Sequence, residues 1–289
     1  MKKIALLIIM TAFCWQFSEA QKPNSKFGGV QIGAITYSFR SMPDQTLEGI
    51  LNYTVQAGLS SIELMGGAVE QYAGVPEDRD EAREWRTTVS MDKFKEIKKM
   101  FETKGVKIHI LKLGDARWSD EEIDYAFVTA KAMGAKAVTE EIGLDAAKRL
   151  APFAEKHGMY IAFHNHMQYA EEGFSADPIL AVSPAVMLNF DAGHYFGSTG
   201  LNPCDFIKKY HDRIYSIHIK DKTGPQTEPA NENQVWGQGE APLAELLLLM
   251  KKERWPICLD IELEYYIANW SNQVKETKTC VQYARNILI

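Results

Sequence analysis

The stretch Asp145–His166, DAAKRLAPFAEKHGMYIAFHNH, contains one complete unit of the pattern that decides the fold. Its first part, Asp145–His157, has the apolar spacing of an amphipathic helix, and Gly158 follows where the chain must turn left-handed. The next run, Met159–Phe163, has the length and composition of a buried strand. Three polar residues, His164-Asn165-His166, end the unit.

The same unit recurs along the rest of the chain. Buried strands are predicted at Gln31–Tyr37, Ser61–Leu64, Lys107–Lys112, Ala135–Val138, Met159–Phe163, Val186–Phe190, Ile214–Ile219 and Ile257–Ile261. Helices are predicted at Leu47–Ala57, Met91–Lys104, Asp120–Met133, Asp145–His157, Pro203–Tyr210, Pro242–Lys252 and Ser271–Leu288, with a short one after the fifth strand. Strands that alternate with helices require parallel pairing through right-handed crossovers. Eight such units predict an α/β fold, a closed (β/α)8 TIM barrel.

Composition agrees with one large globular domain. The chain has 289 residues, of which 46% are hydrophobic and 24% charged, so disorder, collagen and a small disulfide scaffold are excluded. No linker-like tract interrupts the repeats, and we expect one TIM-barrel domain over residues 21–289. Beyond the first segment the cysteines are Cys204, Cys258 and Cys280, which we interpret as buried thiols because their spacing suits no metal site.

The first twenty residues have the features of a secretory signal peptide. Two lysines precede the apolar run Ile4–Phe13, and Ser18-Glu19-Ala20 has small residues where a signal peptidase needs them. We therefore expect cleavage after Ala20, export to the periplasm, and no membrane span, because the run is too short to cross a bilayer. A lipoprotein anchored through Cys14 is the less favoured alternative, since Phe13 fits a lipobox poorly.

The charge balance excludes two classes of partner. The whole chain has a net charge of −6, and cleavage after Ala20, which removes two lysines and one glutamate, changes it to −7. An acidic exported protein without a basic stripe is a poor partner for nucleic acid or for an anionic membrane.

Polar residues gather at the predicted strand ends, where TIM barrels carry their chemistry. In chain order they are Glu63, Lys112, Glu140, Glu141, His164, Asn165, His166, Asp191, His194, His218, Lys220, Asp221, Asp260, Glu262 and Glu264. Four of the seven histidines fall among them. A mixed set of imidazoles and carboxylates favours Mn²⁺, Fe²⁺, Co²⁺ or Zn²⁺. The alternative is a set of unrelated hydrogen bonds across the barrel end.

Two long connections are predicted to form lids or binding loops. They are Gly66–Ser90 after the second strand and Asp221–Glu240 after the seventh. Trp85, in the first of them, would offer an apolar wall for a sugar, with packing in the core as the alternative.

Four motifs carry a family resemblance. They are Phe163-His164-Asn165-His166, Asn189-Phe190-Asp191-Ala192-Gly193-His194, His218-Ile219-Lys220-Asp221 and Asp260-Ile261-Glu262-Leu263-Glu264. Their order and spacing resemble the strand-end motifs of the xylose-isomerase-like sugar isomerase/epimerase superfamily, over essentially the whole mature chain. The resemblance implies a TIM barrel and a small carbohydrate as substrate. It also implies a homo-oligomer, because barrels of this family are often dimers or tetramers.

The resemblance further implies one divalent metal ion, which would be Mn, Co, Zn or Fe. Asp191, His218 and Glu262 match three of its ligands, and His164 stands where relatives usually have a glutamate. This difference puts a symmetrical two-glutamate proton exchange in doubt. Glu140 is the alternative fourth ligand or base.

The remaining roles follow from that metal chemistry. A bound ion would stabilise an enediolate, and Glu262 would take the proton beside the carbonyl. His194 and His166 would bind sugar hydroxyls or move the proton. Lys220 would neutralise developing charge, or else pair with Asp221 or another acid of the barrel end. Glu63, Lys112, Trp85, His194 and Lys220 are the predicted substrate-binding residues, and Glu262, His194, His166, Lys220 and Glu140 the predicted catalytic ones.

Three functions are therefore weighed. The first is a metal-dependent isomerase or epimerase that removes a proton next to a carbonyl of a free keto sugar. The second is a 3-keto-glycoside lyase or hydrolase that uses the same step for β-elimination. The third, less favoured, is a carbohydrate-binding barrel without activity. A DNA-repair endonuclease with this fold is disfavoured by export, by the net charge and by the lack of a basic groove.

Overall fold

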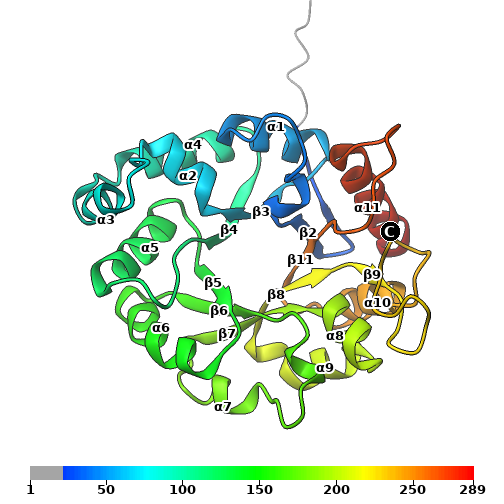
Figure 1. Cartoon of the computed structure of the whole chain (residues 1–289). Helices are drawn as coiled ribbons and strands as arrows, with labels where there is room; N and C mark the ends of the chain where they lie inside the picture. The colour runs from blue at the N-terminus through cyan, green and yellow to red at the C-terminus, as the bar shows by residue number, and fades with distance from the viewer. Residues whose placement is uncertain (1–21) are drawn as a thin grey trace, which may run out of the picture.

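Eight parallel strands curl into a barrel inside a ring of helices in the computed structural model, which describes residues 22–289 (Figure 1). The strands are β2 (Val30–Ala34), β3 (Ser61–Met65), β4 (Lys107–Lys112), β5 (Ala137–Glu141), β6 (Tyr160–His164), β7 (Val186–Asp191), β8 (Ile214–Ile219) and β11 (Cys258–Ile261). The predicted (β/α)8 fold is confirmed. The predicted signal peptide, its cleavage site and Cys14 lie outside the described residues.

The strand order is β2-β11-β8-β7-β6-β5-β4-β3, and each neighbouring pair in it is parallel. Between β2 and β3, the described part of the chain has a single bridge, from Ile35 to Glu63. We call this junction the seam. A short strand, β1 (Lys26–Phe27), pairs antiparallel with β2 outside the barrel. The first strand ends at Ala34, short of the predicted Tyr37, because the 3-10 helix η1 (Thr36–Phe39) begins there.

Helices cover the barrel, and two of them, α5 and α6, show an expected start or end signal. The helices are α1 (Leu47–Gln56), α2 (Gly66–Ala73), α3 (Arg79–Thr88), α4 (Asp92–Thr103), α5 (Asp120–Ala132), α6 (Leu144–His157), α7 (Asp177–Leu180), α8 (Ala192–Thr199), α9 (Pro203–Tyr210), α10 (Leu243–Glu253) and α11 (Gln273–Leu288). Ser119 and Glu122 form a capping box at the start of α5. Gly158 ends α6 with a φ of 62°, which a glycine adopts without strain.

The two long connections are more structured than loops. Gly66–Ser90 folds into α2 and α3, so the prediction of one long loop there is wrong. Asp221–Glu240 contains the antiparallel pair β9 (Asp221–Lys222) and β10 (Asn233–Gln234). A further helix, α8, follows β7 directly.

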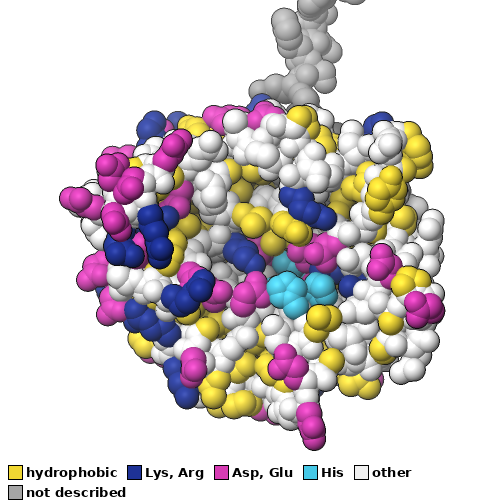
Figure 2. Space-filling view, in the orientation of Figure 1, with side chains coloured by type: hydrophobic (Ala, Val, Ile, Leu, Met, Phe, Trp, Pro, Cys, Tyr) yellow, Lys and Arg dark blue, Asp and Glu magenta, His cyan; other side chains and the backbone are white. Residues whose placement is uncertain are grey.

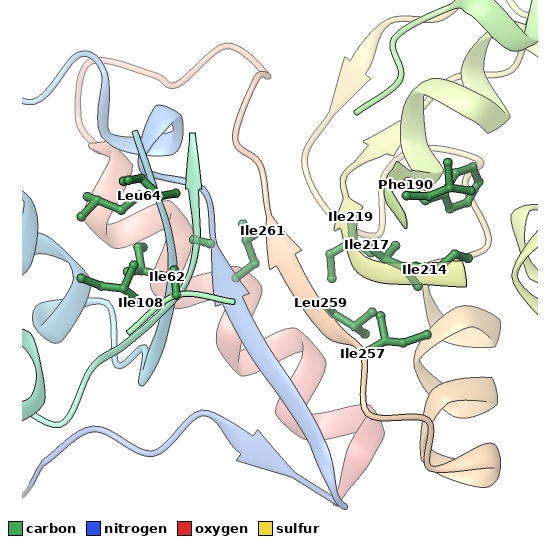
Figure 3. Packing of buried hydrophobic residues seen from close by; sticks show 14 of the residues in the cluster. Ile62, Leu64, Ile108, Phe190, Ile214, Ile217, Ile219, Ile257, Leu259 and Ile261 are labelled. Carbon is green, nitrogen blue, oxygen red and sulfur yellow. The ribbon is translucent and has the colours of Figure 1, made fainter. Parts of the chain in front are cut away.

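Alternation along the strands separates the core from the lumen. Hydrophobic residues such as Ile62, Leu64, Ile217 and Ile219 belong to one large buried cluster with the helices, and Figure 3 shows part of it. The residues between them are polar and buried: Glu63, His218, and Asp260 on β11. Hydrogen bonds join β3 to β8 and β4 to β11, which are not neighbours, so these polar side chains meet across the lumen.

No helix among residues 22–289 combines the length and the hydrophobicity needed to cross a membrane.

Candidate active site

Four side chains converge at the carboxyl ends of consecutive strands: His164 on β6, Asp191 on β7, His218 on β8 and Glu262 directly after β11. One nitrogen or oxygen from each lies within 4.8 Å of the others, and all four residues are buried. Figure 2 shows histidine and acidic side chains together in the central hollow of this face. The geometry therefore brings together the four residues that the sequence predicts as metal ligands.

His164 has the form of a free ligand. Its Nδ1 is buried without a hydrogen-bond partner, and its Nε2 lies 4.0 Å from Asp191 Oδ2. Burial, together with the nearby charge of His218, lowers the pKa of His164 to about 3. A neutral imidazole with an unused lone pair, beside two carboxylates and a second imidazole, fits Zn²⁺ or a similar divalent ion.

His218 is held from both sides by carboxylates. Its Nε2 lies 2.8 Å from Glu63 Oε2, and its Nδ1 lies 3.1 Å from Glu262 Oε2. Burial disfavours charge on this ring, but Glu63 and Glu262 outweigh it and raise the pKa of His218 well above its usual value. Glu63 also accepts a hydrogen bond of 2.9 Å from Asn189 Nδ2. The predicted substrate-binding residue Glu63 thus contacts and orients His218.

Lys220 is buried among the acids of the site. Its Nζ lies 2.6 Å from Glu264 Oε2, 2.7 Å from Glu262 Oε2 and 2.9 Å from Asp191 Oδ2. Burial opposes its charge, yet these three carboxylates outweigh burial and raise the pKa of Lys220. The expected alternative for Lys220, an ion pair with other acids of the barrel end, is present here. Lys220 therefore shares two carboxylates with any bound metal ion.

Asp221 does not pair with Lys220. Its Oδ2 accepts hydrogen bonds from the backbone N–H groups of Gly237, at 2.8 Å, and Gly239, at 3.0 Å. A side chain at Gly239 would clash with this carboxylate, since a Cβ there would lie 2.3 Å from Asp221 Oδ1. Asp221 thus fixes the loop that follows β10.

Helix α8 positions His194. Asp191 caps the helix, because its Oδ1 accepts the backbone N–H of His194 at 2.7 Å. The imidazole Nε2 lies 3.6 Å from Glu264 Oε2 and 3.9 Å from Asp191 Oδ2. Burial, with the charges of Lys220 and Lys222, lowers the pKa of His194 to about 3. His194 is therefore neutral and suited to hydrogen bonding with a hydroxyl group.

A second group lies at the rim of the site. Glu141 contacts Lys112 Nζ at 3.0 Å and His166 Nδ1 at 3.0 Å. Burial tends to raise its pKa, but the hydrogen bond from His166 and the charge of Lys112 lower it to about 2. The same bond raises the pKa of His166. Half-exposed charged groups of this kind suit recognition of sugar hydroxyls at the entrance.

Two predicted residues take no part in this arrangement. Glu140 accepts the backbone N–H of Glu141 at 2.9 Å and stays outside the four-residue cluster, so the geometry favours His164 as the fourth ligand. Trp85, on α3, packs edge-on against Phe94 and Tyr125, with ring centroids 6.5 Å and 6.0 Å away. These are the contacts of a core residue, so Trp85 takes the predicted alternative role, packing in the core.

The sequence patterns missed three buried polar residues. Asn189 lies inside a predicted strand run, and Lys222 lies inside a predicted loop. His109, on β4, bridges Ser61 Oγ at 2.9 Å and Asp260 Oδ2 at 2.8 Å. A polar residue at an inward position of a buried strand is the signal that marks both Asn189 and His109.

Comparisons with known proteins concern the fold and the family of the chain. An inosose dehydratase of Clostridium botulinum (strain Alaska E43 / Type E3) is 39% identical over 79 residues, which are 25% of this chain and 25% of that protein. The chain thus matches about a quarter of the length of this curated relative. A sugar phosphate isomerase/epimerase of Parabacteroides distasonis has a TM-score of 0.63 at 19% identity, covering 90% of this chain and 96% of that one.

A solved structure of the IOLI protein with a bound zinc atom has a TM-score of 0.61 at 17% identity, and covers 90% of this chain and 98% of that one. At these identities the two solved structures show the fold alone. The family description "Xylose isomerase-like TIM barrel" matches residues 51–285, which extend from α1 to α11 and contain every residue of the four-residue cluster. The chain therefore belongs to the xylose isomerase-like TIM barrel family.

Proposed function

We propose that this protein is a metal-dependent enzyme that removes a proton next to a carbonyl of a free keto sugar or a derivative of one. The observation that carries the proposal is the buried cluster of His164, Asp191, His218 and Glu262, in which His164 has no hydrogen-bond partner at Nδ1. These four residues would hold the ion. When bound, a divalent ion supplies Lewis acidity toward adjacent oxygens of the substrate.

The chain's own residues supply the proton chemistry. Burial tends to raise the pKa of Glu262, but Lys220 and His218 outweigh it and hold the pKa well below the usual value. Glu262 is therefore a carboxylate, the form that accepts a proton. Lys220, within 3 Å of that carboxylate, offers positive charge where an oxygen becomes negative. Neutral His194 would hydrogen-bond a sugar hydroxyl.

The same first step leads to two outcomes, and one feature favours elimination. An epimerase of the two-glutamate type needs a second carboxylate to return a proton to the opposite face. Here the matching position holds His164, an imidazole in place of that carboxylate. The curated relative matched over a quarter of its length is a dehydratase by name. We therefore propose β-elimination from a 3-keto-glycoside as the second candidate, beside isomerisation or epimerisation.

Export of the protein to the periplasm, inferred from the first twenty residues, is part of the proposal. Sugar phosphates are mainly cytoplasmic, so a free keto sugar or glycoside is the substrate class that we propose outside the cell. A homo-oligomer stays a prediction. A binding protein without activity is the account that remains if the cluster takes up no metal ion.

Elemental mass spectrometry on the mature protein, purified without chelator or His tag, is the decisive test. We expect about one Mn, Fe, Co or Zn ion per chain, lost in His218→Ala and retained in the control His211→Ala. His211 stacks on Trp255, with ring centroids 4.4 Å apart, and is not part of the cluster. No bound ion, and no affinity for any added divalent ion, would overturn the proposal.

With the metal established, substrate assays separate the outcomes. Free keto sugars and 3-keto-glycosides are incubated with the protein in D₂O. Deuterium in a recovered sugar or in its isomer identifies isomerisation or epimerisation, whereas an unsaturated keto sugar and a free aglycone identify elimination. Absence of both deuterium uptake and product, with metal bound, would contradict proton removal.

A further inference from the structure

Helix α3 carries its positive and negative charges on different faces. Arg79, Arg83 and Arg86 are spaced by four and then three residues, which places them within an arc of about 60° around the helix. The acidic side chains of the same helix begin about 100° around from Arg79, and they are Asp80, Glu84 and Glu81. The three arginines therefore project from one face of α3.

This arginine face lines a cavity of about 360 Å³. Arg117, from the connection between β4 and α5, adds a fourth arginine to the lining. We call the cavity with these four arginines the arginine pocket. Helix α3 and this connection belong to segments that follow strands at their carboxyl ends, so the pocket lies at the end of the barrel that carries the candidate active site. Figure 2 shows Lys and Arg side chains over α3 and α5, on the same face as the histidines of the central hollow.

Arg86 has a structural role in this pocket. Its Nε lies 2.7 Å from Glu70 Oε1 on α2, and its Nη1 lies 3.0 Å from Glu122 Oε1 on α5. Its guanidinium carbon also lies 4.2 Å from the centre of the Trp118 ring. Arg86 therefore joins α3 to two neighbouring helices, and its charge is balanced by two buried carboxylates.

The other three arginines are held less firmly. Arg79 forms no ion pair within the part of the chain that the structure describes. Arg83 Nε lies 3.6 Å from Glu122 Oε2, which is too far for a hydrogen bond, and the Arg83 side chain is 53% exposed. Arg117 binds Asp115, only two residues away, and its side chain is 89% exposed. Arg79 and Arg83 thus have N–H groups free for a ligand.

Arg79 and Arg83 are also poorly placed for the stability of α3. Arg79 is the first residue of the helix, where a positive charge opposes the helix dipole. Arg83 follows it by four residues, and like charges at this spacing on a helix repel one another. A bound anion would relieve both effects. The position of these two side chains on the wall of a cavity therefore points to a negatively charged ligand.

The arginine pocket has an excess of positive charge although the chain as a whole has a net charge of −6. Four arginines and two carboxylates line it, and the excess remains when Glu70 is counted. Guanidinium groups bind oxyanions through two parallel N–H···O bonds. We propose, on the basis of the function proposed above, that the arginine pocket binds the oxyanion group of an acidic saccharide substrate through Arg79 and Arg83. The saccharide bears this group as a sulfate ester or as a carboxylate. Arg79 and Arg83 thus select the substrate, and the proton chemistry stays with the residues of the candidate active site.

Inorganic sulfate tests the pocket without any substrate. Isothermal titration calorimetry is carried out on the metal-loaded protein, on Arg79→Gln/Arg83→Gln and on the control Arg285→Gln, whose arginine is exposed on α11 and outside the pocket. We expect the affinity for sulfate to fall by about tenfold or more in the double variant and to stay within about twofold in the control. The melting temperature of the double variant should be unchanged or higher, because two charges that repel one another are removed.

Proton exchange in D₂O tests whether the ligand is a saccharide. Each neutral keto sugar or 3-keto-glycoside that exchanges its proton is compared with its 6-sulfate and its 6-carboxylate. For one or both acidic forms we expect a KM about tenfold lower than that of the neutral form, with kcat unchanged. This difference in KM should disappear in Arg79→Gln/Arg83→Gln and persist in Arg285→Gln. The acidic form that has the lower KM identifies the group that the pocket binds.

The outcomes keep the two proposals apart. No binding of sulfate, or the same affinity for sulfate in the double variant and in the unaltered protein, would overturn the pocket as an anion site. Sulfate binding together with equal KM values for neutral and acidic substrates would overturn the assignment of a saccharide. If the unaltered, metal-loaded protein exchanges no proton from any of these substrates, the proposed function itself is wrong, while the sulfate titration still reports on the pocket.

Discussion

Replacing Gly193 by alanine tests how α8 and Lys220 fit together. The added Cβ would lie 2.2 Å from Lys220 Cγ and 2.9 Å from the Lys220 backbone oxygen. Carbon atoms in contact prefer about 3.5–4.0 Å, so the helix or the strand end must shift by about 1 Å. Overpacking of this kind costs about 1–3 kcal/mol, while alanine in a helix regains about 0.5–1 kcal/mol. We expect a net loss of about 1–2 kcal/mol in the free energy of unfolding.

Activity should fall further than stability. A shift of about 1 Å displaces the Lys220 ammonium from Glu262 and Asp191, and misplacement on that scale costs about a hundred-fold in rate. Urea unfolding gives the stability, and kcat with the best substrate from the keto-sugar assays gives the activity.

Gly67→Ala, in α2, is the matched control, because nothing lies within 4 Å of a Cβ built there. It should be stabilising by about 0.5–1 kcal/mol. A Gly193→Ala protein as stable and as active as Gly67→Ala would refute the close packing of α8 on Lys220.

Three further predictions concern stability. His109→Ala leaves the fully buried Asp260 carboxylate unpaired, and should lower the unfolding free energy by about 3–5 kcal/mol in thermal or urea unfolding. The pKa of His109 is raised and that of Asp260 is lowered. The contribution of the pair to the free energy of unfolding should therefore be full between about pH 3.9 and 6.5. It should fall as the pH rises through the raised pKa of His109, and also as the pH drops through the lowered pKa of Asp260. A pH–stability profile of His109→Ala that parallels the unaltered protein would contradict this. Trp85→Ala should lower the free energy of unfolding by about 3 kcal/mol, while kcat/KM of the folded protein stays the same. A raised KM would instead support a sugar-binding role for Trp85. Ser119→Ala removes the capping box of α5 and should cost about 1 kcal/mol in urea unfolding, whereas Ser119→Asp should retain most of it.

The barrel itself could be predicted because each strand is buried on both faces and followed by a polar end. Met159–Phe163 is predicted as a strand, and β6 spans Tyr160–His164. Helices α2, α3 and α8 are not predicted, and two of them, α2 and α8, contain two glycines each, which weaken the helical pattern. Helix α8 begins where the Asp191 side chain, at the end of β7, caps its first turn.

The sequence predicts which strand ends form the site, but not how far along the barrel axis each side chain lies. Both His164 and His218 lie at predicted strand ends, which a TIM barrel brings to one face. How far along the lumen a residue lies depends on the stagger of the strands, which no local pattern encodes. For this reason the sequence predicts that Glu63 contacts substrate but does not predict its buried contact with His218. Trp85 likewise depends on packing partners from α4 and α5.

The seam between β2 and β3 links ligand binding in the candidate active site to transient opening of the barrel. Among residues 22–289, one bridge joins these strands, yet Glu63 at that bridge is bonded to His218 and Asn189 from the opposite wall. Parting the strands therefore means pulling Glu63 away from His218. A ligand that requires His218 in place penalises this opening, by about 2.7 kcal/mol when its concentration is a hundred times its Kd. Slower amide hydrogen exchange at Met65, whose N–H is bonded to Thr36 Oγ1 at the seam, would be the sign of a filled site.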